Sequence, residues 1–596
     1  MRISPKKLLH GLLYMAPVFL LTLAACGGGG GGSTSTPSAG PFTLGGSITG
    51  LNGSGLVLQN NGGSDLTVAS GVTSYTFASS VPKDSSYNVT VLTHPSSPTQ
   101  LCSITGGSGT ASADVTTANV ACVNAYTISG TIYGDPTLGA GIGPILQNNG
   151  GDNSFIPSLP ASGVGVAFNF SIPVADGQTY AVTQLARAKS PGQNCAPNAS
   201  ASSVKATGTI AGANVNNVSI YCVSAPIVPK YAYAANNLAN TVSGYTINPS
   251  SGALTQIDLN GASAGMDIAT GSGPYSVTVD PTGHFAYVAN TGTDTLSAYS
   301  INVSTGALTL LTDVNAGIAG NQTSIATGDF PISITIHPSG KFAYTVNQGG
   351  GGGTGNTISA YSINASGALA AIDADGATGT QASIATGTTP YAITVDPLGK
   401  FAYVANNASN TVSAYTIDPI TGALTSAGAA VAAGTNPSSI AIDPKGKCAL
   451  VTNSASDDVK SYLINQISGV LSGVSTVASG STGSAPRSVA VDPNTGLYAY
   501  VANSGGSVSA FSVNSSTCVI ASIDTDAVTG GVNATILAGG APLSINVDPS
   551  GLFVYVANLA SDNVSVYSIG AGGALTPGTS ATAATGNGPV SVTTTE

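Results

Sequence analysis

Short apolar segments that end in asparagine recur along the C-terminal part of the chain. The clearest copy is Phe285–Asn290, in which residues of a type that favours strands follow one another. The same position in other repeats is filled by Tyr231–Asn236, Phe342–Asn347, Phe401–Asn406, Cys448–Asn453, Tyr498–Asn503 and Phe553–Asn558. Successive asparagines are 54, 57, 59, 47, 50 and 55 residues apart. A period near fifty residues predicts a β-propeller with about four strands per blade.

One repeat predicts four strands and two hairpins. We expect strands over 276–279, 285–289, 295–301 and 307–311. Tight turns over 280–283 and 302–306 join strand one to two and strand three to four, because Asp-Pro and Thr-Gly pairs favour such turns. Both hairpins lie at one face of the disc, which we call the lower face. The loops after strands two and four then gather at the opposite face, which we call the upper rim.

The phase of the repeat predicts how the ring closes. A proline precedes strand one in every unit, at Pro274, Pro331, Pro390, Pro437, Pro486, Pro542 and Pro589. The first asparagine-ending segment, at Tyr231, has no strand one before it, whereas Pro589 is followed only by 590–596. We therefore predict that the last strand, 589–593, pairs with the first blade. This closure removes the free sheet edges and gives seven blades.

Two related modules precede the propeller, over 42–123 and 126–223. The segment LQNNGG at 58–63 recurs at 146–151, and alternating residues between turn signals predict a small β-sandwich in each module. Six cysteines follow Cys26, and in an exported protein the module pairs are natural disulfides: Cys102–Cys122 and Cys195–Cys222. Cys448 and Cys518 either bridge adjacent blades or are two buried thiols.

The N-terminus predicts export and lipid anchoring. Residues 1–25 carry a basic start and an apolar run, which is typical of a signal peptide. The ending Leu23-Ala24-Ala25-Cys26 resembles the bacterial lipobox, in which the cysteine is acylated; the alternative is an ordinary signal with a stray cysteine. Residues 26–41, rich in Gly and Ser, predict a flexible tether. The resemblance implies an outer-membrane lipoprotein on the periplasmic or cell-surface face.

Composition narrows the class of protein. Charged residues make up 7 % of the 596 residues, the net charge is −11, and Glu596 is the one glutamate. Few Glu, Lys and Arg remain to build exposed helices, and a chain poor in basic residues does not suit nucleic acid. The prediction is an all-β protein: a seven-bladed propeller over 230–596 behind the two disulfide-containing modules.

The repeat closely resembles the YVTN propeller repeat and the seven-bladed lactonase family, which includes phosphogluconolactonases and muconate-lactonising enzymes. That resemblance implies anionic substrates held by cationic groups at the upper rim. Lys341, Lys400, Lys445 and Lys447 fall in the lower hairpins, with Lys230 at the equivalent place in blade one. His284 and His337 also fall there and are predicted to be solvated. Arg487, directly after Pro486, is the basic residue expected nearest the rim.

Aspartates are the other candidate rim residues. The connections from strand four to the next strand one contain Asp313, Asp373, Asp375, Asp524 and Asp526. Asp373-Ala374-Asp375 and Asp524-Thr525-Asp526 are Asp-x-Asp pairs, whose oxygens are ligands of the kind that Ca²⁺ takes. Asp373 and Asp375 are the candidate metal ligands. The other interpretation is a set of solvated loop carboxylates.

These observations favour a surface-anchored lipoprotein whose propeller is a binding or scaffold module without catalysis, catalytic residues or a cofactor. The predicted partners are the membrane, through the lipid on Cys26, and a neutral glycan or an envelope protein, with no nucleic acid. The family resemblance implies an alternative, the hydrolysis of a sugar lactone.

Overall fold

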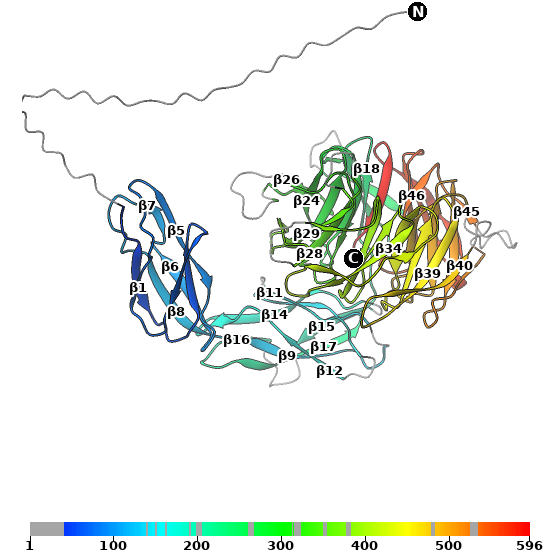
Figure 1. The fold of residues 1–596 in the computed structure, drawn as a ribbon. Coiled ribbons are helices and arrows are strands. Elements are labelled where there is room, and N and C mark those ends of the chain that lie inside the picture. Colours follow the sequence, from blue (N-terminus) through cyan, green and yellow to red (C-terminus); the bar gives the residue numbers. More distant parts are fainter. Residues whose placement is uncertain are drawn as a thin grey trace, which may run out of the picture. The chain divides into compact units, whose positions relative to one another are not determined.

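The computed structural model describes residues 41–596 except 139–140, 150–151, 161–163, 190–191, 198–205, 260–266, 313, 315–322, 350–354, 377–382, 478–482 and 525–534. The described residues are strands and loops with one 3₁₀ turn, η1 (Ala571–Gly573) (Figure 1). They divide into two compact units. One comprises the described residues up to Pro98 together with Cys102–Cys122, and the other comprises Thr99–Leu101 and Val123–Glu596. No described helix has the length and apolar character to cross a bilayer.

The first module is a small β-sandwich. Its strands are β1 (Gly45–Thr49), β2 (Leu56–Asn60), β3 (Ser64–Val68), β4 (Ser74–Thr76), β5 (Ser86–Thr93), β6 (Gln100–Thr105), β7 (Ser108–Thr110) and β8 (Asn119–Tyr126). One sheet has the order β3-β2-β5-β7, and the other joins β4, β1, β8 and β6. Alternate residues such as Leu56 and Leu58 point into the core between them. The disulfide Cys102–Cys122 joins β6 to β8, as predicted.

The second module repeats this plan. Its strands are β9 (Ile128–Tyr133), β10 (Ile145–Asn148), β11 (Asp152–Phe155), β12 (Gly165–Asn169), β13 (Val174–Ala175), β14 (Thr179–Ala186), β15 (Gln193–Pro197), β16 (Thr207–Thr209) and β17 (Val215–Ser224). The sheets run β11-β10-β14-β16 and β12-β9-β17-β15. The predicted disulfide Cys195–Cys222 joins the neighbouring strands β15 and β17.

Seven radial sheets form the propeller. The innermost strands, each beginning at the predicted proline, are β50 (Pro589–Thr594), β22 (Pro274–Val279), β27 (Pro331–Ile336), β32 (Pro390–Val395), β37 (Pro437–Ile442), β41 (Pro486–Val491) and β46 (Pro542–Val547). The second strands are β18 (Tyr231–Asn236), β23 (Phe285–Asn290), β28 (Phe342–Asn347), β33 (Phe401–Asn406), β38 (Cys448–Asn453), β42 (Tyr498–Asn503) and β47 (Phe553–Asn558).

The outer half of each blade is more variable. The third strands are β19 (Thr241–Ile247), β24 (Thr295–Ile301), β29 (Thr357–Ile363), β34 (Thr411–Ile417), β39 (Asp458–Ile464), β43 (Ser507–Val513) and β48 (Asn563–Ile569). The fourth strand is continuous in two blades, as β40 (Leu471–Val477) and β49 (Leu575–Ala584). In the other five it is split into a lower and an upper piece: β20 (Leu254–Ile257) with β21 (Ile268–Ala269), β25 (Leu308–Leu310) with β26 (Ser324–Ala326), β30 (Leu369–Ala371) with β31 (Ser383–Ala385), β35 (Leu424–Ser426) with β36 (Val431–Ala432), and β44 (Ile520–Ser522) with β45 (Thr535–Leu537).

The chain end closes the ring as predicted. Strand β50 pairs antiparallel with β18, from Ala232 opposite Thr594 to Asn236 opposite Pro589 (Figure 1). Blade one is therefore built from the last strand of the chain and the first three strands of the repeat region. Its two sequence-distant parts hold each other in place.

A tyrosine links neighbouring blades in the buried second strands. The hydroxyl of Tyr287 donates to the carbonyl of Gly367 in the next blade's lower hairpin at 3.0 Å, and Tyr233, Tyr344, Tyr403, Tyr500 and Tyr555 do the same at 2.8–3.0 Å. Blade five has Leu450 in place of this tyrosine. There the disulfide Cys448–Cys518 joins the second strand to the next blade's hairpin, so a covalent bond stands where the other blades use a hydrogen bond.

The lower hairpins are organised by buried carboxylates. Asp396, 1 % exposed, accepts hydrogen bonds from the backbone N–H groups of Leu398, Lys400 and Phe401. Asp280, Asp443, Asp492 and Asp548 occupy the same position in other blades. Burial raises the pKa of Asp396, Asp443 and Asp548 above the usual value for a carboxyl, while the backbone donors oppose that rise.

In blade three this position is His337, and its predicted solvation is wrong. The ring is 4 % exposed because Phe155 of the second module and Phe342 pack against it edge-on. Burial lowers the His337 pKa to about 4, so the ring is neutral at pH 7. Its Nε2–H then donates to the Gly399 carbonyl at 2.9 Å, and Nδ1 accepts from the Ser339 backbone at 3.0 Å. His284 is exposed, as expected.

Candidate functional site

The upper rim is held in an unusual backbone conformation. The residue before each blade's proline has a positive φ, and five of these residues are not glycine: Phe330, Thr389, Asn436, Ala485 and Ala541. Side chains other than glycine adopt this region at a cost of roughly 1–2 kcal/mol, so surrounding bonds must impose it. The Asp294 carboxylate accepts from the Phe330 N–H at 2.7 Å, and Asn240, Asn356, Asn410, Asp457 and Asp562 make the equivalent bond to the following blade.

Six of the seven innermost strands carry a serine two residues after the blade's proline, and these serines form a ring. The Ser276 hydroxyl oxygen accepts from the Ile334 N–H of the next blade at 3.3 Å. Five further serines make the same bond at 3.2–3.4 Å: Ser333, Ser439, Ser488, Ser544 and Ser591. Ala392 interrupts the series in blade four. These hydrogen bonds join neighbouring blades, so the serine hydroxyls stabilise the closed ring.

The residue directly after each proline lies at the start of the innermost strand of its blade, at the end of the ring that we call the channel mouth. The seven residues are Tyr275, Ile332, Tyr391, Ser438, Arg487, Leu543 and Val590. A register shift follows the proline in every blade, which separates this residue from the regular strand pairing. The phenol oxygens of Tyr275 and Tyr391 lie 2.6 Å apart, although their blades are separated by blade three. The two side chains therefore reach each other past blade three.

Arg487 lies close enough to this tyrosine pair for its charge to act on Tyr275. Burial raises the Tyr275 pKa above its ordinary value, the neighbouring Tyr391 raises it further, and the Arg487 charge lowers it in part. Among the described residues, the buried Nε of Arg487 has no hydrogen-bond acceptor. A buried guanidinium N–H without an acceptor costs about 1–3 kcal/mol, and a ligand oxygen could accept from it. The mouth thus combines two phenols with one cation.

The predicted aspartates that the structure describes follow outer strands of their blades. Asp373 and Asp375 follow the lower piece of the split fourth strand, β30, and Ala374 between them accepts a hydrogen bond from Leu424 of the next blade's outer strand at 2.8 Å. Asp524 follows β44 in the same way. Residues 377–382 and 525–534 of these connections lie outside the described residues, so a place for these aspartates at the rim stays a prediction. Asp313, Asp526 and Cys26 lie outside the described residues.

The described residues contain no group of three or more His, Cys, Asp or Glu placed to hold a metal ion. Asp373 has a buried Oδ1 without a hydrogen-bond partner in the described chain. The Ca²⁺ site at Asp373 and Asp375 remains a prediction.

Among the predicted rim residues that the structure describes, Arg487 is the one that directly follows a repeat proline. Tyr275 and Tyr391 are functional candidates that the sequence reasoning missed. The sequence feature that could have identified them is their position directly after the repeat proline, which they share with Arg487. Lys230, Lys341, Lys400, Lys445 and Lys447 flank the lower hairpins, away from this site.

The sequence matches the family described as "Lactonase, 7-bladed beta-propeller" over residues 227–348, 320–483, 435–537 and 475–594. The chain belongs to this lactonase propeller family. A 6-phosphogluconolactonase from Formosa agariphila is 32 % identical over 160 residues, which is 27 % of this chain and 40 % of that protein. The match therefore spans less than half the length of this relative.

A solved structure of a related propeller shows the same fold. A putative 6-phosphogluconolactonase from Bacteroides uniformis is 18 % identical, with a TM-score of 0.50 over 62 % of this chain and all of that chain. A periplasmic gluconolactonase from Pseudomonas aeruginosa is 15 % identical, with a TM-score of 0.47 over 62 % of this chain and 99 % of that chain. At 18 % identity the likeness to the Bacteroides uniformis structure concerns the fold alone, and activity has to be argued from the site.

Proposed function

We propose that this lactonase-family propeller binds a sugar-derived ligand, a neutral glycan or a sugar acid, at the channel mouth without turning it over. The observation that carries the proposal is the composition of the ring after the prolines. Arg487 supplies a donor without an acceptor, and Tyr275 and Tyr391 supply aromatic faces and hydroxyls of the kind that hold sugars. None of the seven ring residues is Asp, Glu or His. The ring itself therefore offers recognition groups and no general base to activate water.

Lactone hydrolysis is the second candidate function, and membership of the family favours it. Arg487 could polarise a lactone carbonyl, and the Tyr275–Tyr391 pair could donate a proton to the leaving alkoxide. A phosphorylated lactone fits less well, because a phosphate dianion normally takes several cationic donors and this ring has one.

Calorimetry and a rate assay on the detergent-solubilised full chain distinguish the two. We expect glucono-1,5-lactone and gluconate to bind, while the lactone opens at its uncatalysed rate. Arg487→Gln should weaken binding about tenfold, because a hydrogen bond from a charged donor contributes about 1.5–3 kcal/mol. Lys447→Gln, which removes an exposed charge from the lower face, should leave binding unchanged. Lactone opening above background that is lost in Arg487→Gln would establish the hydrolase instead, and absence of any sugar binding would contradict both.

We also propose that a lipid on Cys26 holds the chain at the outer membrane, where an envelope protein is a further proposed partner. The lipobox-like sequence 23–26 and the Gly/Ser-rich segment after it support this proposal. When the chain is expressed in a Gram-negative host fed labelled palmitate, we expect label in the protein and recovery in the membrane fraction. Cys26→Ser should lose both. Release of the unmodified wild-type chain into the soluble periplasm would contradict the anchor.

A further inference from the structure

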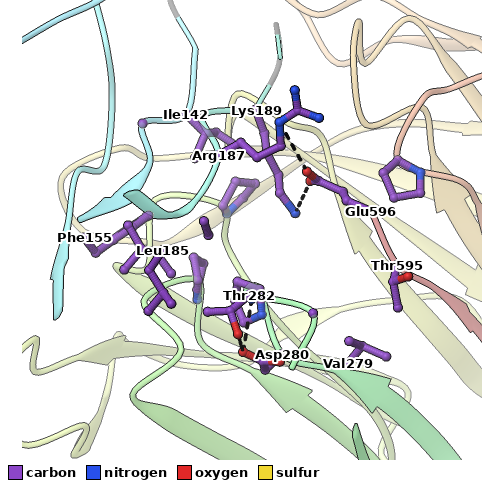
Figure 2. Close-up of a pocket in the computed structure, with 18 of the residues that line it drawn as sticks. Ile142, Phe155, Leu185, Arg187, Lys189, Val279, Asp280, Thr282, Thr595 and Glu596 are labelled. Carbon is purple, nitrogen blue, oxygen red and sulfur yellow. Dashed lines mark hydrogen bonds and ion pairs between the residues drawn. The ribbon is translucent and has the colours of Figure 1, made fainter. Parts of the chain in front are cut away.

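A cavity of about 460 Å³ lies between the second module and the lower face of the propeller (Figure 2). The module contributes Ile142, Phe155 and Leu185 from one side, and the propeller contributes Val279 and the prolines of four lower hairpins from the other: Pro281, Pro338, Pro397 and Pro549. This volume is in the range of small-molecule sites, which are about 300–1,000 Å³. It is separate from the channel mouth, which lies at the opposite face.

One end of this cavity is cationic. Arg187, Lys189 and Lys230 line it, and they are three of only 14 Lys and Arg residues in a chain with net charge −11. Arg187 is held in place by Asn194, which accepts from its Nε at 3.0 Å, and by the Pro226 carbonyl, which accepts from Nη1 at 3.1 Å. Such a local excess of positive charge in an acidic protein indicates recognition of an anion.

The side chains that line the cavity carry three positive charges and two negative ones, the latter from Asp280 and Glu596. The Asp280 carboxylate is hydrogen-bonded within its own hairpin, where it accepts from the N–H groups of Thr282, His284 and Phe285. Glu596 pairs with Lys189 at 2.9 Å and with Arg187 at 4.0 Å, and these two are the ion pairs of the described chain (Figure 2). Lys230 takes part in neither pair.

The contacts of Glu596 show that the cationic end of the cavity binds a carboxylate. Its side-chain carboxylate is the only one in the cavity that reaches Arg187 and Lys189, and it is 17 % exposed there. The Lys189 side chain remains 37 % exposed, so the pair is accessible to a competing anion. A carboxylate on a small molecule could therefore replace the carboxylate of Glu596.

We propose that this cavity is a second binding site, for a small amphiphile with one carboxylate and an apolar body. The carboxylate takes the place of the Glu596 side chain at Arg187 and Lys189, near Lys230. The apolar body lies against Ile142, Phe155 and Leu185, whose burial from water drives binding. Glu596 acts as an internal competitor that satisfies the two cations when the ligand is absent. This site is independent of the sugar site proposed at Arg487.

Octanoate, acetate and octanamide test the proposal by calorimetry on the detergent-solubilised full chain below the micellar concentration of octanoate. We expect octanoate to bind more tightly than acetate, which lacks the body, and octanamide, which lacks the charge. Arg187→Gln and Lys189→Gln should each weaken octanoate binding about tenfold, since a charged hydrogen bond contributes about 1.5–3 kcal/mol. Glu596→Gln should strengthen it by up to about tenfold, because the internal competitor loses its charge.

Two controls keep the test specific. Lys445→Gln removes an exposed lower-face charge outside the cavity lining and should leave octanoate binding unchanged. Arg487→Gln should leave it unchanged as well, so failure at one site is distinguishable from failure at the other. Equal binding of octanoate and octanamide, no binding by either wild type or Glu596→Gln, or equal weakening by Lys445→Gln would overturn the proposal. A thermal melt of each variant separates lost binding from lost folding.

Discussion

Truncation after Gly588 is expected to unfold the propeller at temperatures where the full chain is folded. It removes β50, whose ladder with β18 runs from Asn236 to Ala232, and the buried side chains of Val590 and Val592. Each ladder bond contributes about 1 kcal/mol and each buried valine about 1.5 kcal/mol or more. Together these losses are of the order of the 5–15 kcal/mol that holds a typical domain folded. The measurement is differential scanning calorimetry of truncated and full chains.

The matched control removes the same number of residues from the segment rich in Gly and Ser, at 30–37. That deletion should not change the melting temperature of the propeller. The first module has its own core and its own disulfide, so its transition should be the same in all three proteins. A truncated chain whose propeller melts like the full chain would show that β50 does not hold the ring closed.

Asp396→Ala is expected to cost about 3–5 kcal/mol of unfolding free energy. The substitution leaves the N–H groups of Leu398, Lys400 and Phe401 without their acceptor in a hairpin where Asp396 is 1 % exposed. A buried donor left unpaired costs about 1–3 kcal/mol, and water entering the space left by the carboxylate offsets part of the sum. Urea unfolding of both proteins, followed by tyrosine fluorescence, gives the difference.

Two further variants test whether burial sets the size of this loss in stability. Asp396→Asn keeps one acceptor oxygen and should lose less than half as much stability. Asp418→Ala removes a carboxylate that also accepts from two backbone N–H groups, of Ile420 and Thr421, but in an exposed hairpin. Because water can pair with those donors, its cost should stay within about 1 kcal/mol. Equal losses for Asp396→Ala and Asp418→Ala would show that burial does not set the cost of losing these carboxylates.

The repeat in the sequence determined the propeller, because the strands within a blade pair with their neighbours in sequence, and the phase of the repeat determined the closure between the two ends of the repeat region. The Phe285–Asn290 pattern fixes a strand, the Asp280–Gly283 turn fixes its partner, and the position of Pro589 fixes which strand is left for blade one. The same reasoning located the two module disulfides, since Cys195 and Cys222 lie on neighbouring strands of one sheet.

The tertiary structure alone decided which side chains meet. Tyr275, Tyr391 and Arg487 come from three blades that are not neighbours. The contact between the two tyrosines and the approach of Arg487 to Tyr275 therefore depend on the diameter of the closed ring and on the bulge after each proline. Asp373 and Asp375 follow a strand that breaks at the outer edge, and strand periodicity does not predict where such a break occurs. The cationic cavity also depends on tertiary structure. Arg187 and Lys189 reach Glu596 because the second module packs on the lower face of the propeller, and the sequence repeats do not predict that contact.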